Sequence, residues 1–215
     1  MQNKIAVLIV AAVSAMNANA GLLVVNPGFD ADVLTDGTST CNGTIGFTGW
    51  NSFGFGCGTG LLNPDSSQYP GGVAPSQNNV AYHNGPAGFW QALIDTYQAG
   101  NTYTFALQVG QRLDVGFGGY IIELRSGSGT GALLASTTNA VSPGAGTFLP
   151  TSVSYTVGSA NAAIGQQIAV VFRGIGTQTS FDNVTVDSSV PEPGTYAMVG
   201  AGALLALLRH KRRQR

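Results

Sequence analysis

Charged side chains are scarce in this chain and make up 9% of its 215 residues. Cations are scarcest between residues 21 and 190, where Arg112, Arg125 and Arg173 stand against eight aspartates and Glu123, a net charge of −6. Nucleic-acid binding needs clustered cations that neutralise phosphates, which this region lacks. We therefore expect no nucleic-acid partner.

Catalytic motifs are missing as well. Residues 21–190 contain one histidine, His83, and no nucleophile elbow, phosphate loop, zinc motif or dinucleotide fingerprint. Glu123 has the strand parity of a solvent-facing residue, so we expect it at the surface, away from any second carboxylate in a cleft. These absences predict a non-catalytic protein; the alternative is a hydrolase that uses His83 or an aspartate pair.

Helical periodicity is absent, and apolar residues instead recur at every second position, the spacing of half-buried strands. Gly-rich turns separate these rows, and residues 31–79 form the loosest, most loop-rich region. The pattern predicts an all-β, antiparallel β-sandwich of about nine short strands. The rows lie at residues 22–25, 80–83, 89–94, 103–109, 120–124, 133–136, 153–157, 168–172 and 181–186.

The N-terminal segment combines Lys4, an apolar run over residues 5–13 and the small-x-small sequence Ala18-Asn19-Ala20. This order is typical of a secretory signal peptide, so we expect export and removal of residues 1–20 by signal peptidase. A short buried helix or an uncleaved anchor is the alternative, although so short an apolar run does not span a bilayer.

The C-terminal segment places Pro191, Glu192 and Pro193 before an apolar run over residues 196–208 and a basic end. A helix over this run reaches about 20 Å, a marginal membrane anchor whose basic end stays cytoplasmic. The arrangement over residues 190–215 resembles the PEP-CTERM sorting segment of Gram-negative bacteria. The resemblance implies recognition of the Pro-Glu-Pro motif by exosortase, transient anchoring in the inner membrane and delivery to the cell surface or extracellular matrix, commonly beside exopolysaccharide. A plain tail anchor is the alternative.

Cysteine is limited to one pair, Cys41 and Cys57. In an exported chain such a pair is expected to be oxidised, and closing a loop of this length contributes about 3 kcal/mol through the unfolded state. A metal or redox pair is the alternative, and no histidine or second cysteine pair lies nearby to support it.

Short motifs between residues 21 and 189 resemble galactose-binding-like jelly rolls, which include several carbohydrate-binding module families. The resemblance implies a jelly-roll-like sandwich, with a structural calcium where its first and last strands meet; Asp30 and Asp182 occupy the corresponding positions. The parity of Asp182 matches that of Val184 and Val186, so its carboxylate is expected to point inward and to need a partner. The alternative is that both aspartates only form turns. The motifs are residues 23–30, Gly49-Trp50, 88–91, 99–103 and 181–186.

Carbohydrate binders present exposed aromatic rings to sugars, which makes Trp50, Phe53 and Phe55 the candidate ligand-binding residues. Core packing is the alternative for each ring. The low charge and the abundant Gly, Ser, Thr and Asn favour a neutral polymer such as exopolysaccharide. The sequence therefore predicts an exported, non-catalytic cell-surface protein that binds polysaccharide; a purely structural or adhesive matrix protein is the alternative.

Overall fold

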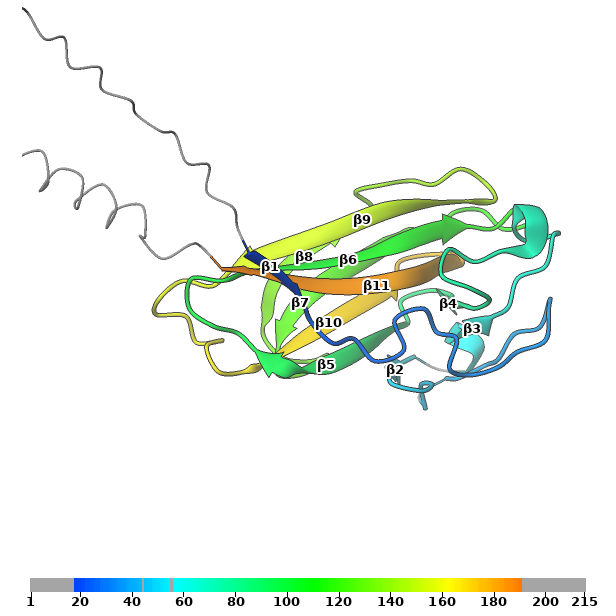
Figure 1. The fold of residues 1–215 in the computed structure, drawn as a ribbon. Coiled ribbons are helices and arrows are strands. Elements are labelled where there is room, and N and C mark those ends of the chain that lie inside the picture. Colours follow the sequence, from blue (N-terminus) through cyan, green and yellow to red (C-terminus); the bar gives the residue numbers. More distant parts are fainter. Residues whose placement is uncertain (1–17, 44, 55, 191–215) are drawn as a thin grey trace, which may run out of the picture. The chain divides into compact units, whose positions relative to one another are not determined.

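Antiparallel strands dominate the computed structural model, which describes residues 18–43, 45–54 and 56–190 (Figure 1). Two short 3-10 helices, η1 (Gly56–Gly58) and η2 (Pro70–Gly72), interrupt the loops. The strands are β1 (Ala18–Gly21), β2 (Asn51–Phe53), β3 (Thr59–Leu62), β4 (Val80–His83), β5 (Gly88–Thr96), β6 (Thr102–Gln111), β7 (Tyr120–Ser126), β8 (Leu133–Thr138), β9 (Thr147–Thr156), β10 (Gln167–Gly174) and β11 (Thr179–Val190).

The strands form two facing sheets, so the predicted β-sandwich is confirmed. One sheet has the order β3-β4-β11-β6-β9, with β1 beside β11, and the other has the order β2-β5-β10-β7-β8. Connections that cross from one sheet to the other place β11, the last strand, in the middle of its sheet. β11 therefore lies between β4 on one side and β6 on the other.

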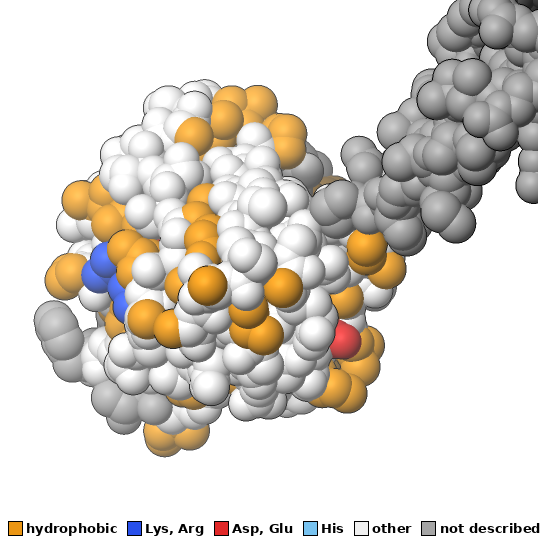
Figure 2. Space-filling model, turned by 90° about the vertical axis from the view of Figure 1, so that its left-hand side faces the viewer, with side chains coloured by type: hydrophobic (Ala, Val, Ile, Leu, Met, Phe, Trp, Pro, Cys, Tyr) orange, Lys and Arg blue, Asp and Glu red, His pale blue; other side chains and the backbone are white. Residues whose placement is uncertain are grey.

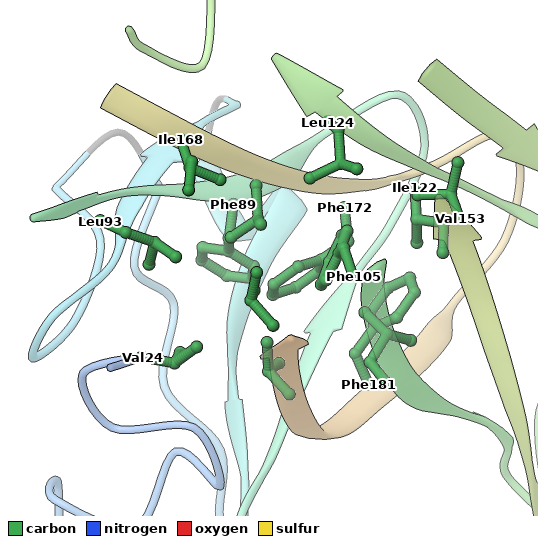
Figure 3. Packing of buried hydrophobic residues seen from close by; sticks show 14 of the residues in the cluster. Val24, Phe89, Leu93, Phe105, Ile122, Leu124, Val153, Ile168, Phe172 and Phe181 are labelled. Atoms are coloured by element: carbon green, nitrogen blue, oxygen red, sulfur yellow. The ribbon is translucent and has the colours of Figure 1, made fainter. Parts of the chain in front are cut away.

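Apolar rows from both sheets fill the space between them. Phe89 and Phe172 from one sheet meet Phe105 and Phe181 from the other (Figure 3), and all four are fully buried. The rings of Phe172 and Phe181 lie 4.8 Å apart between centroids, a tilted pair. Burying one such side chain contributes roughly 1.5–3 kcal/mol, so these rows supply most of the stabilising energy of the fold.

The region between residues 31 and 79 is loop-rich, as predicted, and the expected disulfide joins Cys41 and Cys57 with their Cα atoms 4.5 Å apart. Two aromatic rings of the loop that the disulfide closes pack against the core. The ring centroids of Phe47 and Phe89 lie 4.6 Å apart, and those of Trp50 and Phe172 lie 5.2 Å apart. The disulfide therefore holds a loop that completes the core.

The predicted strand at residues 22–25 is wrong, because the chain forms β1 just before it and then leaves the sheet. Leu22 still donates its N–H to the carbonyl of Val186 at 2.7 Å, after which Val24 turns into the core. Residues 1–17 and 191–215 lie outside the described residues, so most of the predicted signal peptide, the Pro191, Glu192 and Pro193 motif and the run 196–208 have no structural description here. No helix among the described residues has the length and apolar character needed to cross a bilayer.

Glu123 is buried, contrary to the prediction, although it does lie on the outer face of its sheet. Its carboxylate accepts from Arg125 Nε at 2.6 Å and from Arg173 Nη2 at 2.8 Å. The loop after β7 folds back over this face: Arg125 Nη1 donates to the carbonyl of Gly131 at 2.8 Å, and a Cβ on Gly129 would lie 2.3 Å from the ring of Trp90. Strand parity gives the face correctly but does not show that a loop covers it.

Candidate functional site

Asp182 has no exposed surface, but its side chain points to the side of the sheet opposite to the predicted one. The register of β11 against β6 shifts after Asp182, because Asn183, with a φ of 53°, is the extra residue of a β-bulge. The bulge reverses the alternation, so Phe181 and Val184 both enter the core while Asp182 faces away from it. The parity prediction is wrong because nothing in the apolar pattern marks the bulge.

The loop before β4 covers Asp182 on this outer face. Asp182 Oδ2 accepts the main-chain N–H of Ser76 at 2.7 Å. Asp182 Oδ1 accepts the Ser76 hydroxyl at 2.8 Å and the N–H of Asn183 at 2.6 Å. Among the described residues no Lys or Arg forms an ion pair with it. Burial raises the pKa of Asp182 to about 7 in spite of these hydrogen bonds, and the neighbouring Asp30 carboxylate adds to the increase.

Asp30 lies on the other side of Ser76. Its Oδ1 accepts the N–H groups of Asn78 and Asn79, both at 2.9 Å, and its Oδ2 lies 3.2 Å from the Ser76 hydroxyl. The structure thus brings together the two predicted aspartates, and it adds Ser76, which the sequence reasoning missed. Ser76 sits in a turn between two other loop residues, and no spacing or motif distinguishes it from other surface serines.

The Ser76 hydroxyl carries one proton but faces three acceptors: Gly28 O at 3.2 Å, Asp30 Oδ2 at 3.2 Å and Asp182 Oδ1 at 2.8 Å. Two carboxylates this close in a buried place do not both ionise without a compensating positive charge. A proton or a cation must supply that charge. The four converging oxygens are hard donors of the kind that Ca²⁺ prefers. The predicted calcium at Asp30 and Asp182 therefore fits the residues present and stays a prediction, although the described residues contain no group of three or more His, Cys, Asp or Glu that could hold a metal.

Of the aromatic residues predicted to bind ligand, the structure describes Trp50 and Phe53. Trp50 is 3% exposed, packs against Phe29 with ring centroids 5.5 Å apart, and donates its Nε1–H to the carbonyl of Asn26 at 3.0 Å. Phe53 is half-buried in β2, and Phe55 lies outside the described residues. The prediction for Trp50 is wrong, because the disulfide-closed loop folds this ring into the core.

His83 lies between the two sheets, where it cannot act as a catalytic base. It has no exposed surface, its ring stacks 5.1 Å from Phe181, and a Cβ on Gly174 would come within 1.8 Å of it. Within the described residues neither ring nitrogen has a hydrogen-bond partner, and burial lowers the pKa to about 3. The imidazole is therefore neutral and out of reach of a substrate, so a hydrolase based on His83 has no support.

Residues 20–187 match the family described as HpiC1-like, the family of the HpiC1 cyclase. The chain belongs to this family. Residues 189–213 match the PEP-CTERM protein-sorting motif, which confirms the predicted sorting segment and implies export, cell-surface sorting and processing by exosortase. A comparison with curated proteins finds no match.

Solved structures of cyclases share the fold. The Stig cyclase Fisc from Fischerella sp. TAU, in complex with (3Z)-3-(1-methyl-2-pyrrolidinylidene)-3H-indole, is 20% identical over 81% of this chain and 100% of its own, with a TM-score of 0.71. A cyclase from the same organism with 4-(1H-indol-3-yl)butan-2-one is 23% identical over 81% of this chain and all of its own, with a TM-score of 0.62. An arabinose-bound α-L-arabinofuranosidase is 14% identical over 79% of this chain and 26% of its own, with a TM-score of 0.52.

Membership in a cyclase family overturns the prediction of a non-catalytic protein. The missing motifs belong to hydrolases, zinc enzymes and nucleotide-binding enzymes, and their absence excludes only those chemistries. Acid catalysis of a ring closure needs as little as one well-placed proton donor. The prediction failed because it searched only for the motifs of those other enzyme classes.

Proposed function

We propose that this exported protein is a small-molecule cyclase, and that Asp182 and Ser76 deliver the proton that starts the ring closure. The observation that carries this proposal is the group of Asp30, Ser76 and Asp182, in which two acids share one hydroxyl and neither acid pairs with a Lys or Arg among the described residues. Membership in the cyclase family supports the reaction class.

The arrangement suits proton transfer from a sealed acid to the surface. Asp182 is fully buried, whereas Ser76 and Asp30 are half-buried and reach solvent. The protonated Asp182 carboxyl donates to Ser76 Oγ while the Ser76 hydroxyl gives its own proton to the substrate, and a proton lost from the product restores Asp182. A general acid is most effective when its pKa lies near the working pH, and the raised pKa of Asp182 meets that condition.

The remaining carboxylate has a separate role in this proposal. Asp30 Oδ1 accepts the N–H groups of Asn78 and Asn79, which hold the carboxylate in place beside Ser76. A fixed negative charge beside the proton donor stabilises the cation that forms when an electron-rich substrate is protonated. The substrate class is therefore an uncharged or weakly basic, electron-rich small molecule, for which the indole compounds bound to the Fischerella cyclases provide a first probe.

The proposal is tested by measuring whether the protein transfers a proton to a carbon atom of a substrate. The full chain is incubated in D₂O with 4-(1H-indol-3-yl)butan-2-one, the molecule present in one of the similar structures, and deuterium incorporation is followed by NMR. We expect Asp182→Asn and Ser76→Ala to slow incorporation by about a hundredfold. The matched control Asp36→Asn removes the same charge from an exposed loop and should leave the rate unchanged. Equal rates for Asp182→Asn and Asp36→Asn would contradict the role of Asp182.

The converging oxygens favour a second proposal for the same residues, the structural calcium predicted from the sequence. A bound Ca²⁺ takes the place of the proton, so the two proposals exclude each other at any one moment. Calorimetric titration of the full chain with CaCl₂ after EGTA treatment distinguishes them. Binding that raises the Tm in the wild type, is lost in Asp30→Asn and stops deuterium incorporation assigns the site to calcium.

A further inference from the structure

A second pocket lies about 20 Å along β11 from Asp182, where β5 ends, β6 begins and β11 approaches its own end. Its volume is about 300 Å³, at the lower limit of ligand sites and suited to one small ring. Figure 2 looks at this end of the sandwich and shows mostly uncharged polar and hydrophobic surface with isolated charges. The residues used below are Leu22, Ile94, Asp95, Asn101, Tyr103 and Ser188, all of which line the pocket.

Three polar side chains of this pocket have no hydrogen-bond partner among the described residues. They are the carboxylate of Asp95, the amide of Asn101 and the hydroxyl of Ser188, which come from β5, the β5–β6 loop and β11 respectively. Ser188 is 8% exposed and lines the pocket. Three unpaired groups from separate elements converge on one hollow, which is the arrangement of a polar ligand site.

The other polar groups of the pocket are fixed in place. The hydroxyl of Tyr103 donates to the carbonyl of Thr96 at 3.2 Å and accepts the N–H of Gln98 at 2.9 Å, which ties the turn after β5 to the start of β6. The side chain of Gln98 is bonded to Thr96 Oγ1 at 2.9 Å. The loop that carries Asn101 is therefore held in position without any hydrogen bond of the Asn101 side chain to a described residue.

The chemistry of the lining selects among ligand classes. No Lys or Arg lines the pocket, and Asp95 brings a negative charge, so phosphates, sulfates and carboxylates are repelled. A carboxylate accepts hydrogen bonds from two neighbouring hydroxyls, while an amide offers one donor and one acceptor. Ile94, which is 72% exposed, and Leu22 supply an apolar wall for the C–H face of a ring.

We infer that this pocket binds one neutral sugar ring through Asp95, Asn101 and Ser188. This inference does not depend on the role of Asp182, and it places sugar binding at the end of β5 opposite to the one that pairs with β2, the strand of Phe53. The sugar is either free or a residue of a neutral polysaccharide, which present the same hydroxyls to the pocket.

NMR titration of the full chain with the methyl glycosides of glucose, galactose and mannose tests the inference, with glucosamine and glucuronate as charged probes. We expect at least one neutral glycoside to shift the amide signals around Asn101 and Ser188, glucuronate to leave them unchanged, and glucosamine to bind no better than the neutral ring. A hexasaccharide of the bound sugar that binds about tenfold tighter than the single ring identifies the polymer as the ligand. A hexasaccharide of equal affinity identifies the free sugar.

Variants separate this pocket from non-specific binding. Because their side chains make no hydrogen bonds within the described residues, Asn101→Ala and Ser188→Ala should keep the wild-type Tm and weaken sugar binding by about tenfold each. Asp36→Ala is the control for Asp95→Ala, because it removes an exposed carboxylate elsewhere. Three outcomes overturn the inference: no neutral glycoside binds, glucosamine binds best as expected of an amine site, or Asn101→Ala and Ser188→Ala bind as the wild type does.

Discussion

Glu123 and Asp182 are two buried acids on the outer faces of the two sheets, and the charge of each carboxylate is compensated in a different way. Glu123 forms ion pairs with Arg125 and Arg173 at 2.6 and 2.8 Å. Asp182 has only neutral N–H and O–H donors and a second acid, Asp30, close by. A buried carboxylate is compensated by cations in the first case and by a shared proton or a bound metal ion in the second.

The comparison distinguishes the acid that we propose as a proton donor from an acid held by cations. A carboxylate with two guanidinium partners contributes to structure through charge-assisted hydrogen bonds. A buried acid whose pKa has risen to about 7 changes its protonation near neutral pH and is available for proton transfer. Burial alone, which both residues share, does not distinguish the two.

Glu123→Gln should have the largest effect on stability. It leaves two guanidinium groups without their carboxylate, and because Arg125 and Arg173 are 19% and 36% exposed, we expect a loss of about 3 kcal/mol, the low end for breaking a buried pair. Denaturant unfolding at pH 7 measures it. The control is Asp114→Asn, which breaks the more exposed pair with Arg112 and should cost less than about 1 kcal/mol. Equal losses for the two variants would mean that burial adds nothing to the Glu123 pairs.

His83 extends the comparison to a buried base without a charged partner. Its pKa is lowered from 6.5 to about 3 by burial, so its contribution to stability is complete above about pH 6.5 and is lost as the pH falls toward 3. At pH 5 the loss is roughly 2 kcal/mol relative to pH 8. Thermal unfolding of His83→Gln should lack this acid-side loss. The same slope in both proteins would contradict the assignment to His83.

Asp182→Asn should have the smallest effect and the opposite pH dependence. The pKa of Asp182 is raised from 3.8 to about 7, so the stabilising contribution of its proton is complete below about pH 4 and is lost as the pH rises through 7. Between pH 5 and pH 8 the wild type loses roughly 2–3 kcal/mol through this group, and Asp182→Asn does not. We therefore expect the variant to cost about 1 kcal/mol at pH 5, through one lost acceptor, and to be about 1–2 kcal/mol more stable than the wild type at pH 8. Because His83 and Asp182 oppose each other, the wild-type curve is flatter than that of either variant. Parallel curves for wild type and Asp182→Asn between pH 4 and 8 would rule out the shifted pKa.

Features that depend on contiguous residues of the chain could be predicted from the sequence. Period-two rows gave β4 and most of β5, β6, β7, β8 and β10, because the alternation of strand faces is a local property of the backbone. The rows at 153–157 and 181–186 gave only the last part of β9 and the middle of β11. The sorting motif was readable for the same reason, since its tripeptide, apolar run and basic end are contiguous. Cys41 and Cys57 were the only candidates for a disulfide.

Only some residues of the candidate site could be predicted from the sequence. Asp30 and Asp182 were identified from short motifs, but Ser76, which joins them, carries no mark in the sequence. The extra residue at Asn183 reversed the side on which Asp182 lies, and the loop after β7 buried Glu123 on an outer face. The three unpaired groups of the second pocket come from residues 95, 101 and 188, which no local pattern connects.

The sequence by itself determined the all-β class, the disulfide and the sorting segment, because each depends on composition or on neighbours along the chain. The tertiary structure decided which acids are buried, which of them meet a cation and which meet each other. Burial and the neighbouring groups set the pKa of Asp182, on which its proposed role in proton transfer depends, because the energy of a charge depends on what surrounds it in space.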